Sequence, residues 1–100
     1  MADSTPKGYW LVHLTVHDAG EFMAYMRASR AIFKEWNATY VVQAGQAETR
    51  EGAACDKHVV VMFESYEAAR ACYESAEYQD AIKLRDDCAN FNLVIAEGVS

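Results

Sequence analysis

The sequence predicts a single α+β domain in which two helices cover one face of a four-stranded antiparallel sheet. Two observations lead to this prediction. Strand, helix and strand patterns occur twice in the same order, over residues 8–45 and again over residues 57–97. A chain of 100 residues with 52% hydrophobic residues also has the size and the apolar content of one core. We expect residues 8–100 to form this domain and residues 1–7 to be a flexible leader.

The first strand and the first helix have clear patterns. Residues 9–17 alternate between two sets of side chains, as a strand with two different faces does. Asp18 can then accept from the free N–H groups of a helix start, and Glu21 completes a capping box. Inward-facing residues recur every three or four positions up to Trp36, which predicts an amphipathic helix of about five turns that ends near Asn37.

The middle of the chain predicts the second and third strands. Residues 40–44 are a short β-branched run, and residues 58–64 alternate again between two faces. Two glycines flank the polar segment 46–51, which we interpret as a hairpin.

The last third of the chain predicts a second helix and a final strand. Ser65 suits the N-cap of an alanine-rich helix. Ser75 suits a second cap, so this helix is expected to kink or restart there before it ends near Asp87. Residues 91–97 then supply the fourth strand.

The resulting order, β-α-β-β-α-β, is that of the ferredoxin-like fold, which leaves one face of the sheet without helices. The even-numbered residues of the first strand and the odd-numbered residues of the third are more uniformly apolar, so we assign them to the helix side. The open face is then lined by Tyr9, Leu11, His13, Val60 and Met62. These residues are too apolar to face water as a patch, and we therefore predict a homodimer that forms through this face.

Charge and hydropathy argue against several classes of partner. The chain has 15 acidic and 9 basic residues and a net charge of −6, so nucleic acid and anionic membranes are expected to repel it. No apolar run approaches the roughly 20 residues that cross a bilayer, and residues 1–7 lack the apolar stretch of a signal peptide. We expect a cytoplasmic protein whose three widely spaced cysteines are reduced and unpaired.

Much of the sequence also resembles a known family. The similar positions are Gly8-Tyr9-Trp10, His13, Thr15, Val16 and Asp18, then Phe63-Glu64-Ser65, Glu67-Ala68-Ala69-Arg70-Ala71, Tyr73, Ser75, Glu77-Tyr78-Gln79 and Leu84-Arg85, and finally residues 93–98. In these positions the chain resembles the uncharacterised bacterial family called domain of unknown function 1330. The likeness covers residues 8–98, and residues 67–85 are its most specific part.

The resemblance implies a dimeric α/β barrel, the architecture shared by cofactor-free monooxygenases, muconolactone isomerases and several stress-responsive proteins. It brings no agreed activity. Where family members commonly have an arginine followed by two glycines, this chain has Gln43, Ala44 and Gly45, which weakens any anion site carried over from the family. Met62 stands where many members are acidic and Cys72 where many have tryptophan, so the open face is less charged here.

His13 is the candidate catalytic residue. An imidazole on the open face could act as a general acid or base and move protons on a bound ligand. The candidate ligand-binding residues are Tyr9, Thr15, Gln43, Met62 and Asn92. A second interpretation gives His13 a hydrogen bond across the dimer interface and makes Tyr9 and Met62 interface packing.

No metal site and no cofactor are predicted. His13 and His17 share a face, but four residues of strand separate them by about 13 Å, which is too far to chelate one ion. His17 is expected instead near His58 and Asp56, in a small polar cluster at the edge of the sheet.

Two classes of function remain open. The first is a small-molecule-binding barrel, which includes a cofactor-free enzyme that works by proton transfer or oxygenation. The second is a non-enzymatic dimer whose interface is filled by its own side chains and which has a structural or protein-interaction role. Both classes need the same apolar open face, so the sequence does not decide whether the chain is an enzyme. Phe22, Phe33 and Trp36 lie at helical spacing and are interpreted as core rather than as a ligand cage.

Overall fold

Seven elements follow one another in the computed structural model, which describes residues 5–52 and 55–99. The strands are β1 (Gly8–Val16), β2 (Thr39–Gln43), β3 (Lys57–Phe63) and β4 (Ala89–Glu97). The helices are α1 (Ala19–Glu35), α2 (Tyr66–Glu74) and α3 (Ala76–Ile82). Residues 1–4 of the predicted leader lie outside the described residues.

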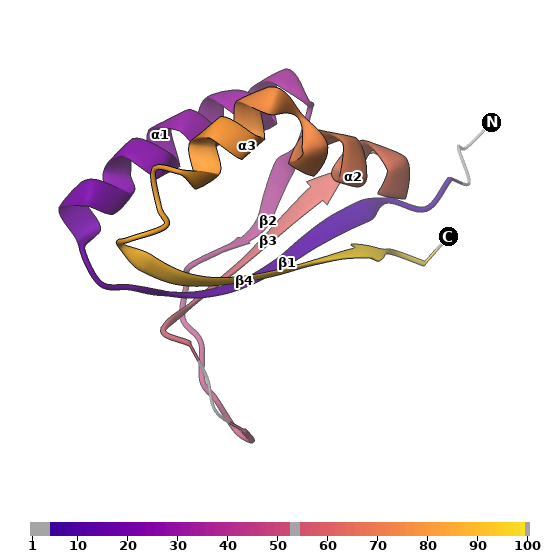
Figure 1. The fold of residues 1–100 in the computed structure, drawn as a ribbon. Coiled ribbons are helices and arrows are strands. Elements are labelled where there is room, and N and C mark those ends of the chain that lie inside the picture. The colour runs from indigo at the N-terminus through magenta and orange to yellow at the C-terminus, as the bar shows by residue number, and fades with distance from the viewer. Residues whose placement is uncertain (1–4, 53–54, 100) are drawn as a thin grey trace.

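The four strands form one antiparallel sheet, and the helices lie together on one face of it (Figure 1). The strand order is β2-β3-β1-β4, so β1 is central and pairs with both β3 and β4. This arrangement confirms the predicted ferredoxin-like fold. The second predicted helix is divided at Ser75 into α2 and α3, as its cap pattern indicates. In the described part of the chain, no helix is long and apolar enough to cross a bilayer.

Each helix begins at a residue whose side chain caps it. Asp18, Ser65 and Ser75 accept hydrogen bonds from the backbone N–H three residues further on, at 3.1, 3.0 and 3.3 Å. Ser75 also donates through its hydroxyl to the carbonyl of Cys72 at 2.7 Å. The break between α2 and α3 therefore satisfies backbone groups of both helices through one side chain.

Trp10 occupies the centre of the core between the helices and the sheet. It is 1% exposed, and its ring centroid lies 5.3, 5.0 and 4.8 Å from those of Phe33, Phe63 and Tyr78. Its indole N–H donates to the carbonyl of Ala69 at 2.9 Å. The inward residues of β1 and β3 that are buried are Trp10, Val12, Leu14, Val61 and Phe63. The predicted helix side of these two strands is therefore confirmed.

A β-bulge in β2 changes the face of the sheet to which the last side chains of this strand point. Tyr40 lies opposite Val61, but Val42 lies opposite Val60, so the register shifts between the two positions. The bulge reverses the alternation, because the extra residue moves the following side chains to the other face. Gln43 therefore faces the helices.

The connection between β2 and β3 extends away from the sheet (Figure 1). The Ala44 N–H still donates to the carbonyl of His58 at 2.9 Å, which prolongs the pairing of the two strands. Beyond this bond the described part of the loop contains no strand, and the hairpin pairing predicted for residues 46–51 is not seen there.

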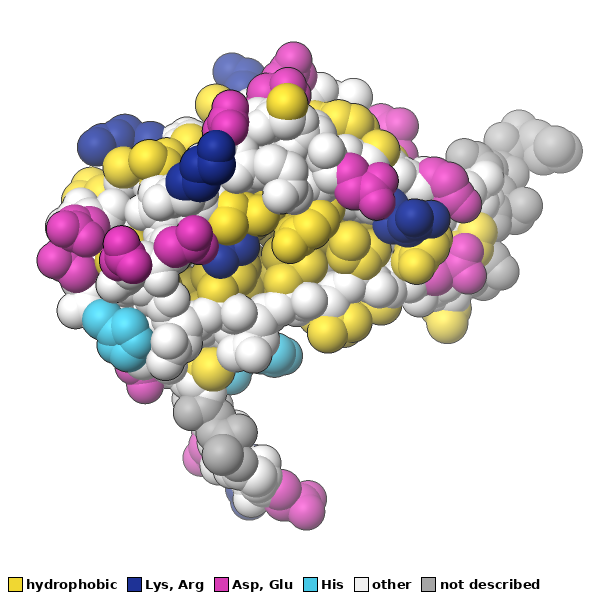
Figure 2. Space-filling model, viewed as in Figure 1, with side chains coloured by type: hydrophobic (Ala, Val, Ile, Leu, Met, Phe, Trp, Pro, Cys, Tyr) yellow, Lys and Arg dark blue, Asp and Glu magenta, His cyan; other side chains and the backbone are white. Residues whose placement is uncertain are grey.

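The open face of the sheet receives no Asp, Glu, Lys or Arg side chain from its own strands, among the described residues. The strand register places on it Tyr9, Leu11, His13, Thr15, Thr39, Val42, His58, Val60, Met62, Asn90, Asn92, Val94 and Ala96. Val42 and Val94 are 41% and 58% exposed. Charged side chains gather instead on the helix layer and on the projecting loop (Figure 2). The chain thus has a partly apolar sheet face that its own helices do not cover.

Candidate ligand-binding cavity

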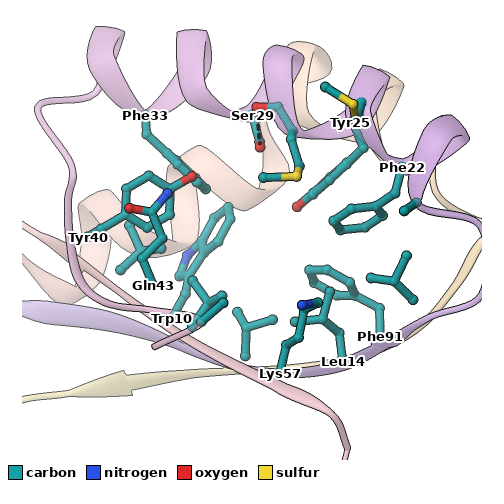
Figure 3. A pocket seen from close by; sticks show the side chains of 18 of the residues that line it. Trp10, Leu14, Phe22, Tyr25, Ser29, Phe33, Tyr40, Gln43, Lys57 and Phe91 are labelled. Carbon is teal, nitrogen blue, oxygen red and sulfur yellow. Dashed lines mark hydrogen bonds between the residues drawn. The ribbon is translucent and has the colours of Figure 1, made fainter. Parts of the chain in front are cut away.

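A cavity of about 510 Å³ lies between α1 and the sheet face that the helices cover (Figure 3). Inward residues of β1 and β3 form its floor, and α1 forms its roof. Phe91 of β4 closes one end, and Tyr40 and Gln43 line the side towards β2. Met23 and Lys57 also line the cavity and are exposed, so they mark its opening. We call this space the α1 cavity.

The roof of the α1 cavity follows from the sequence of the helix. The lining residues Phe22, Tyr25, Met26, Ser29 and Phe33 recur every three or four positions and so share one face of α1. The floor follows from alternation, since every second residue of β1 points to the same side. Two ordinary amphipathic patterns therefore build the cavity.

The walls are mainly apolar, and few polar groups reach the α1 cavity. These are the hydroxyls of Tyr25, Ser29 and Tyr40, the amide of Gln43 and the ammonium group of Lys57. No Asp, Glu or His is among the described lining residues, and Lys57 is the one charged residue among them. An apolar space with a few convergent polar groups is typical of a small-molecule site.

Tyr25 reaches from α1 towards the space above the sheet (Figure 3). Its hydroxyl oxygen lies 2.6 Å from that of Tyr78, which is fully buried behind it. Burial, and then the neighbouring Tyr78, raises the pKa of Tyr25 well above its ordinary value. Burial also raises the pKa of Tyr40. Both phenols are therefore neutral near pH 7 and able to donate a hydrogen bond to a ligand.

Most of the predicted site residues lie together on the open face and not in the α1 cavity. His13 Nδ1 lies 2.8 Å from His58 Nδ1, and the Asn92 side-chain N–H donates to the His13 carbonyl at 3.3 Å. Tyr9 and Met62 lie opposite each other in the same sheet face. Of the predicted ligand-binding residues, Gln43 is the one that lines the α1 cavity.

The polar cluster predicted at the edge of the sheet is arranged differently. The register pairs His58 with His13, so the predicted approach of His17 to His58 is wrong. Thr15 on the open face accepts through its hydroxyl from the Asp56 N–H at 3.3 Å. Within the described residues, no group of three His, Cys, Asp or Glu side chains could hold a metal ion.

A second hollow, of about 660 Å³, lies on the open face beside the loop that follows β2. It is lined by His13, Cys55, His58, Asn92 and residues 47–51. It is more open and less apolar than the α1 cavity, and exposed loop residues form part of its wall. The α1 cavity is therefore the better candidate for holding an organic molecule.

Sequence patterns do not distinguish the wall of this cavity from the core. Phe22 and Phe33 are interpreted above as core, and they are only 7% and 6% exposed, yet both line the α1 cavity. Helical spacing of apolar residues predicts that a face is buried, not how completely the space beneath it is filled. A usable signal is the polar pair Tyr25 and Ser29 within the apolar stripe, because buried polar groups need partners.

Comparison with known proteins adds a family and a set of related folds. The model of the family described as "Domain of unknown function (DUF1330)" matches residues 7–99. No curated protein matches the sequence.

Several solved structures are similar to this chain. A protein of unknown function from Rhodopseudomonas palustris has a TM-score of 0.76 and 16% identity, over 95% of this chain and 84% of that one. SnoaB, a cofactor-independent oxygenase from Streptomyces nogalater, has a TM-score of 0.64 and 14% identity, over 96% of both chains. A dimeric ferredoxin-like protein of unknown function from Thermobifida fusca has a TM-score of 0.61 and 11% identity, over 97% of this chain and 95% of that one. These likenesses show a shared fold.

Proposed function

We propose that this chain, which belongs to the DUF1330 family of domains of unknown function, forms a homodimer and binds a small organic molecule in the α1 cavity. The observation that carries the proposal is the cavity itself, with its volume of about 510 Å³. Small-molecule sites have volumes of about 300–1,000 Å³ and combine apolar walls with a few polar groups. The α1 cavity has both properties.

The walls favour a ligand with a flat, apolar body. Trp10, Phe22, Phe33 and Phe91 present aromatic rings to the cavity, and rings of this kind pack well against planar apolar molecules. The hydroxyl of Tyr25 supplies a hydrogen bond that would orient one polar group of such a molecule.

The cavity supports binding more directly than catalysis. SnoaB, which has the same fold, is a cofactor-independent oxygenase, and a cofactor-free reaction is therefore a natural extension of the proposal. Proton abstraction needs a base within hydrogen-bond reach of the substrate. Because no carboxylate or imidazole is among the described lining residues, proton transfer would depend on Lys57 or on the phenols of Tyr25 and Tyr40.

In this proposal His13 and its neighbours belong to the dimer interface. The strands place no Asp, Glu, Lys or Arg on the described open face, so a second copy of the same face is a chemically matched partner for them. The Thermobifida fusca protein of the same fold is dimeric, which supports a second copy as the partner. The contact between His13 and His58 would then lie within each chain, beneath the partner subunit.

Filling the α1 cavity tests the binding function. Ser29 is 3% exposed and lines the roof, so Ser29→Leu adds an apolar side chain to the space that a ligand would occupy. We expect this variant to bind the neutral fluorophore N-phenylnaphthylamine at least about tenfold more weakly than the wild type, a loss of about 1.4 kcal/mol. Fluorescence titration measures the affinity.

Ala31→Leu is the matched control, since Ala31 lies on the exposed side of the same helix and does not line the cavity. It should bind the fluorophore as the wild type does. If both variants are folded and bind it with wild-type affinity, the probe occupies another site and the proposal fails.

A further inference from the structure

A buried arginine stands behind the wall of the α1 cavity. Arg85 follows α3, is 9% exposed, and forms no ion pair among the described residues. Its guanidinium carbon lies 3.7 Å from the ring centroid of Phe91 and 5.3 Å from that of Tyr25. In the described structure its Nε atom is buried and has no hydrogen-bond partner. A buried cation without a counter-ion is costly, so its position calls for an explanation.

Arg85 is connected to the cavity through two phenols. Its guanidinium group lies over the Tyr25 ring, and its positive charge favours the ionised forms of both phenols, against the larger effect of burial, which raises the pKa of each. Tyr78 and Tyr25 are themselves hydrogen-bonded at 2.6 Å, and Tyr25 lines the cavity whereas Arg85 does not. The three side chains therefore form a continuous path from a buried positive charge to the cavity.

Either phenol can be the donor in the hydrogen bond between Tyr25 and Tyr78. An acceptor inside the cavity selects the arrangement in which Tyr78 donates to Tyr25, because Tyr25 then keeps its own proton for that acceptor. Hydrogen bonds in such a chain polarise one another, and the cation at its far end makes Tyr25 a stronger donor.

The charged residues around the α1 cavity also favour a hydrogen-bond acceptor with negative charge. The whole chain has a net charge of −6, yet no acidic residue is among the described lining residues. The one charged lining residue in that part of the chain, Lys57, is a cation at the opening. Lys57 at the opening and Arg85 behind the wall are two cations beside a cavity whose described lining has no carboxylate, and both favour an anion.

Resting on the ligand-binding function proposed above, we infer that the molecule in the α1 cavity carries an anionic oxygen, a phenolate, enolate or carboxylate, on an apolar body. The oxygen accepts the hydrogen bond of Tyr25, and Tyr78 and Arg85 stabilise its charge from behind. The apolar body lies among the rings of Trp10, Phe22 and Phe33. A phenol or enol that binds from neutral solution releases its proton to water as it enters.

The protonation state of a bound phenol tests this inference directly. The probe is para-nitrophenol, whose phenolate absorbs visible light and whose neutral form does not. We expect the ratio of ionised to neutral probe to be at least about tenfold higher in the bound state than in free solution at the same pH, equivalent to about one pKa unit. Para-nitroanisole, which has no ionisable proton, is the neutral reference for binding.

Tyr25→Phe removes the donor and keeps the ring. In this variant the excess ionisation of bound para-nitrophenol, measured at saturating protein so that a change in affinity does not affect it, should fall by about tenfold. Tyr40→Phe is the matched control, because Tyr40 is a second phenol of the cavity and lies at the β2 side, away from Arg85. This control variant should keep the wild-type excess of ionised over neutral para-nitrophenol in the bound state. Arg85→Lys keeps a charge but loses the planar fork, and should also reduce the excess ionisation of bound para-nitrophenol.

The outcomes separate the two claims. If para-nitroanisole binds and bound para-nitrophenol is no more ionised than the free probe, the inference is overturned and the binding function stands. If neither probe binds, the binding function fails and the inference fails with it. Para-nitrobenzoate and its methyl ester distinguish carboxylate from phenolate ligands, and a preference for the ester over the acid would also contradict an anion site.

Discussion

Tyr25 is one side chain that serves both the core and the cavity. It is 6% exposed, and its ring centroid lies 5.2 Å from that of Phe22 and 5.6 Å from that of Phe91. Its hydroxyl bonds to Tyr78 at the cavity wall. The packing of the ring and the chemistry of the hydroxyl are therefore separable, and Tyr25→Phe can change ligand chemistry while most of the packing remains.

Buried acidic groups make the stability depend on pH in the alkaline range. Burial, and then the charge of Glu77, raises the pKa of the Cys72 thiol from 9.0 to about 12. Between these values the thiol is ionised in the unfolded chain but protonated in the folded one, so the unfolded state binds fewer protons. The free energy of unfolding therefore falls as pH rises through this window. Tyr25 and Tyr78 act in the same direction, since burial raises their pKa as well.

We predict that Cys72→Ala weakens this pH dependence. Urea unfolding below and above pH 9 should show a smaller decrease in stability for the variant than for the wild type. Cys55→Ala is the control, because Cys55 is only partly buried, and it should keep the wild-type decrease. Equal decreases in all three proteins would show that the Cys72 thiol ionises alike in the folded and unfolded chains.

Among the secondary-structure elements, the break between α2 and α3 depends on a single side chain. Ser75 caps α3 and donates to the carbonyl of Cys72 near the end of α2. We predict that Ser75→Ala lowers the free energy of unfolding by about 1–2 kcal/mol, measured by urea unfolding. Ser65→Ala, which removes the cap of α2 alone, should cost less. The reverse order would mean that the break between the helices does not depend on Ser75.

Local signals explain why the elements are predictable. Asp18, Ser65 and Ser75 cap helices at their own positions, so the sequence shows these starts without knowledge of the rest of the fold. The faces of β1 and β3 are predictable for the same reason, because alternation is a local property of a strand.

The bulge and the register explain why the candidate site is not predictable in the same way. Strict alternation puts Gln43 and Tyr40 on opposite faces, but the bulge brings both to the α1 cavity. A register shift of four residues leaves every side chain on its own face, so the hydrophobic pattern alone does not choose between His13 and His17 as the partner of His58. Cavities depend on such long-range geometry, and most of the predicted site residues accordingly lie on the open face, outside the α1 cavity.

At the scale of the whole molecule, the distribution of charged residues bears on dimer formation. The strands contribute no Asp, Glu, Lys or Arg side chain to the described open face, and Glu48, Arg50 and Glu51 of the projecting loop line a hollow at its edge. Burying the strand residues of this face between two copies removes apolar side chains from water without burying an Asp, Glu, Lys or Arg of the described strands. The desolvation cost of burying the strand residues is therefore low.

We predict that Val94→Asp breaks the dimer without unfolding the chain. Val94 is 58% exposed in the monomer, so aspartate is tolerated there by the fold but would be buried without a partner in the interface. Light scattering should show a monomer, and circular dichroism an unchanged fold. Val99→Asp is the matched control, because Val99 is 97% exposed and lies outside the sheet, and it should remain a dimer. A stable Val94→Asp dimer would exclude the open face as the interface.

The most direct test of the α1 cavity as the binding site is a crystal structure of the protein purified from cells without added ligand. We predict ordered non-protein density between α1 and the sheet, within hydrogen-bond distance of the Tyr25 hydroxyl. Density beside His13 on the open face, with side chains filling the space beneath α1, would contradict this account.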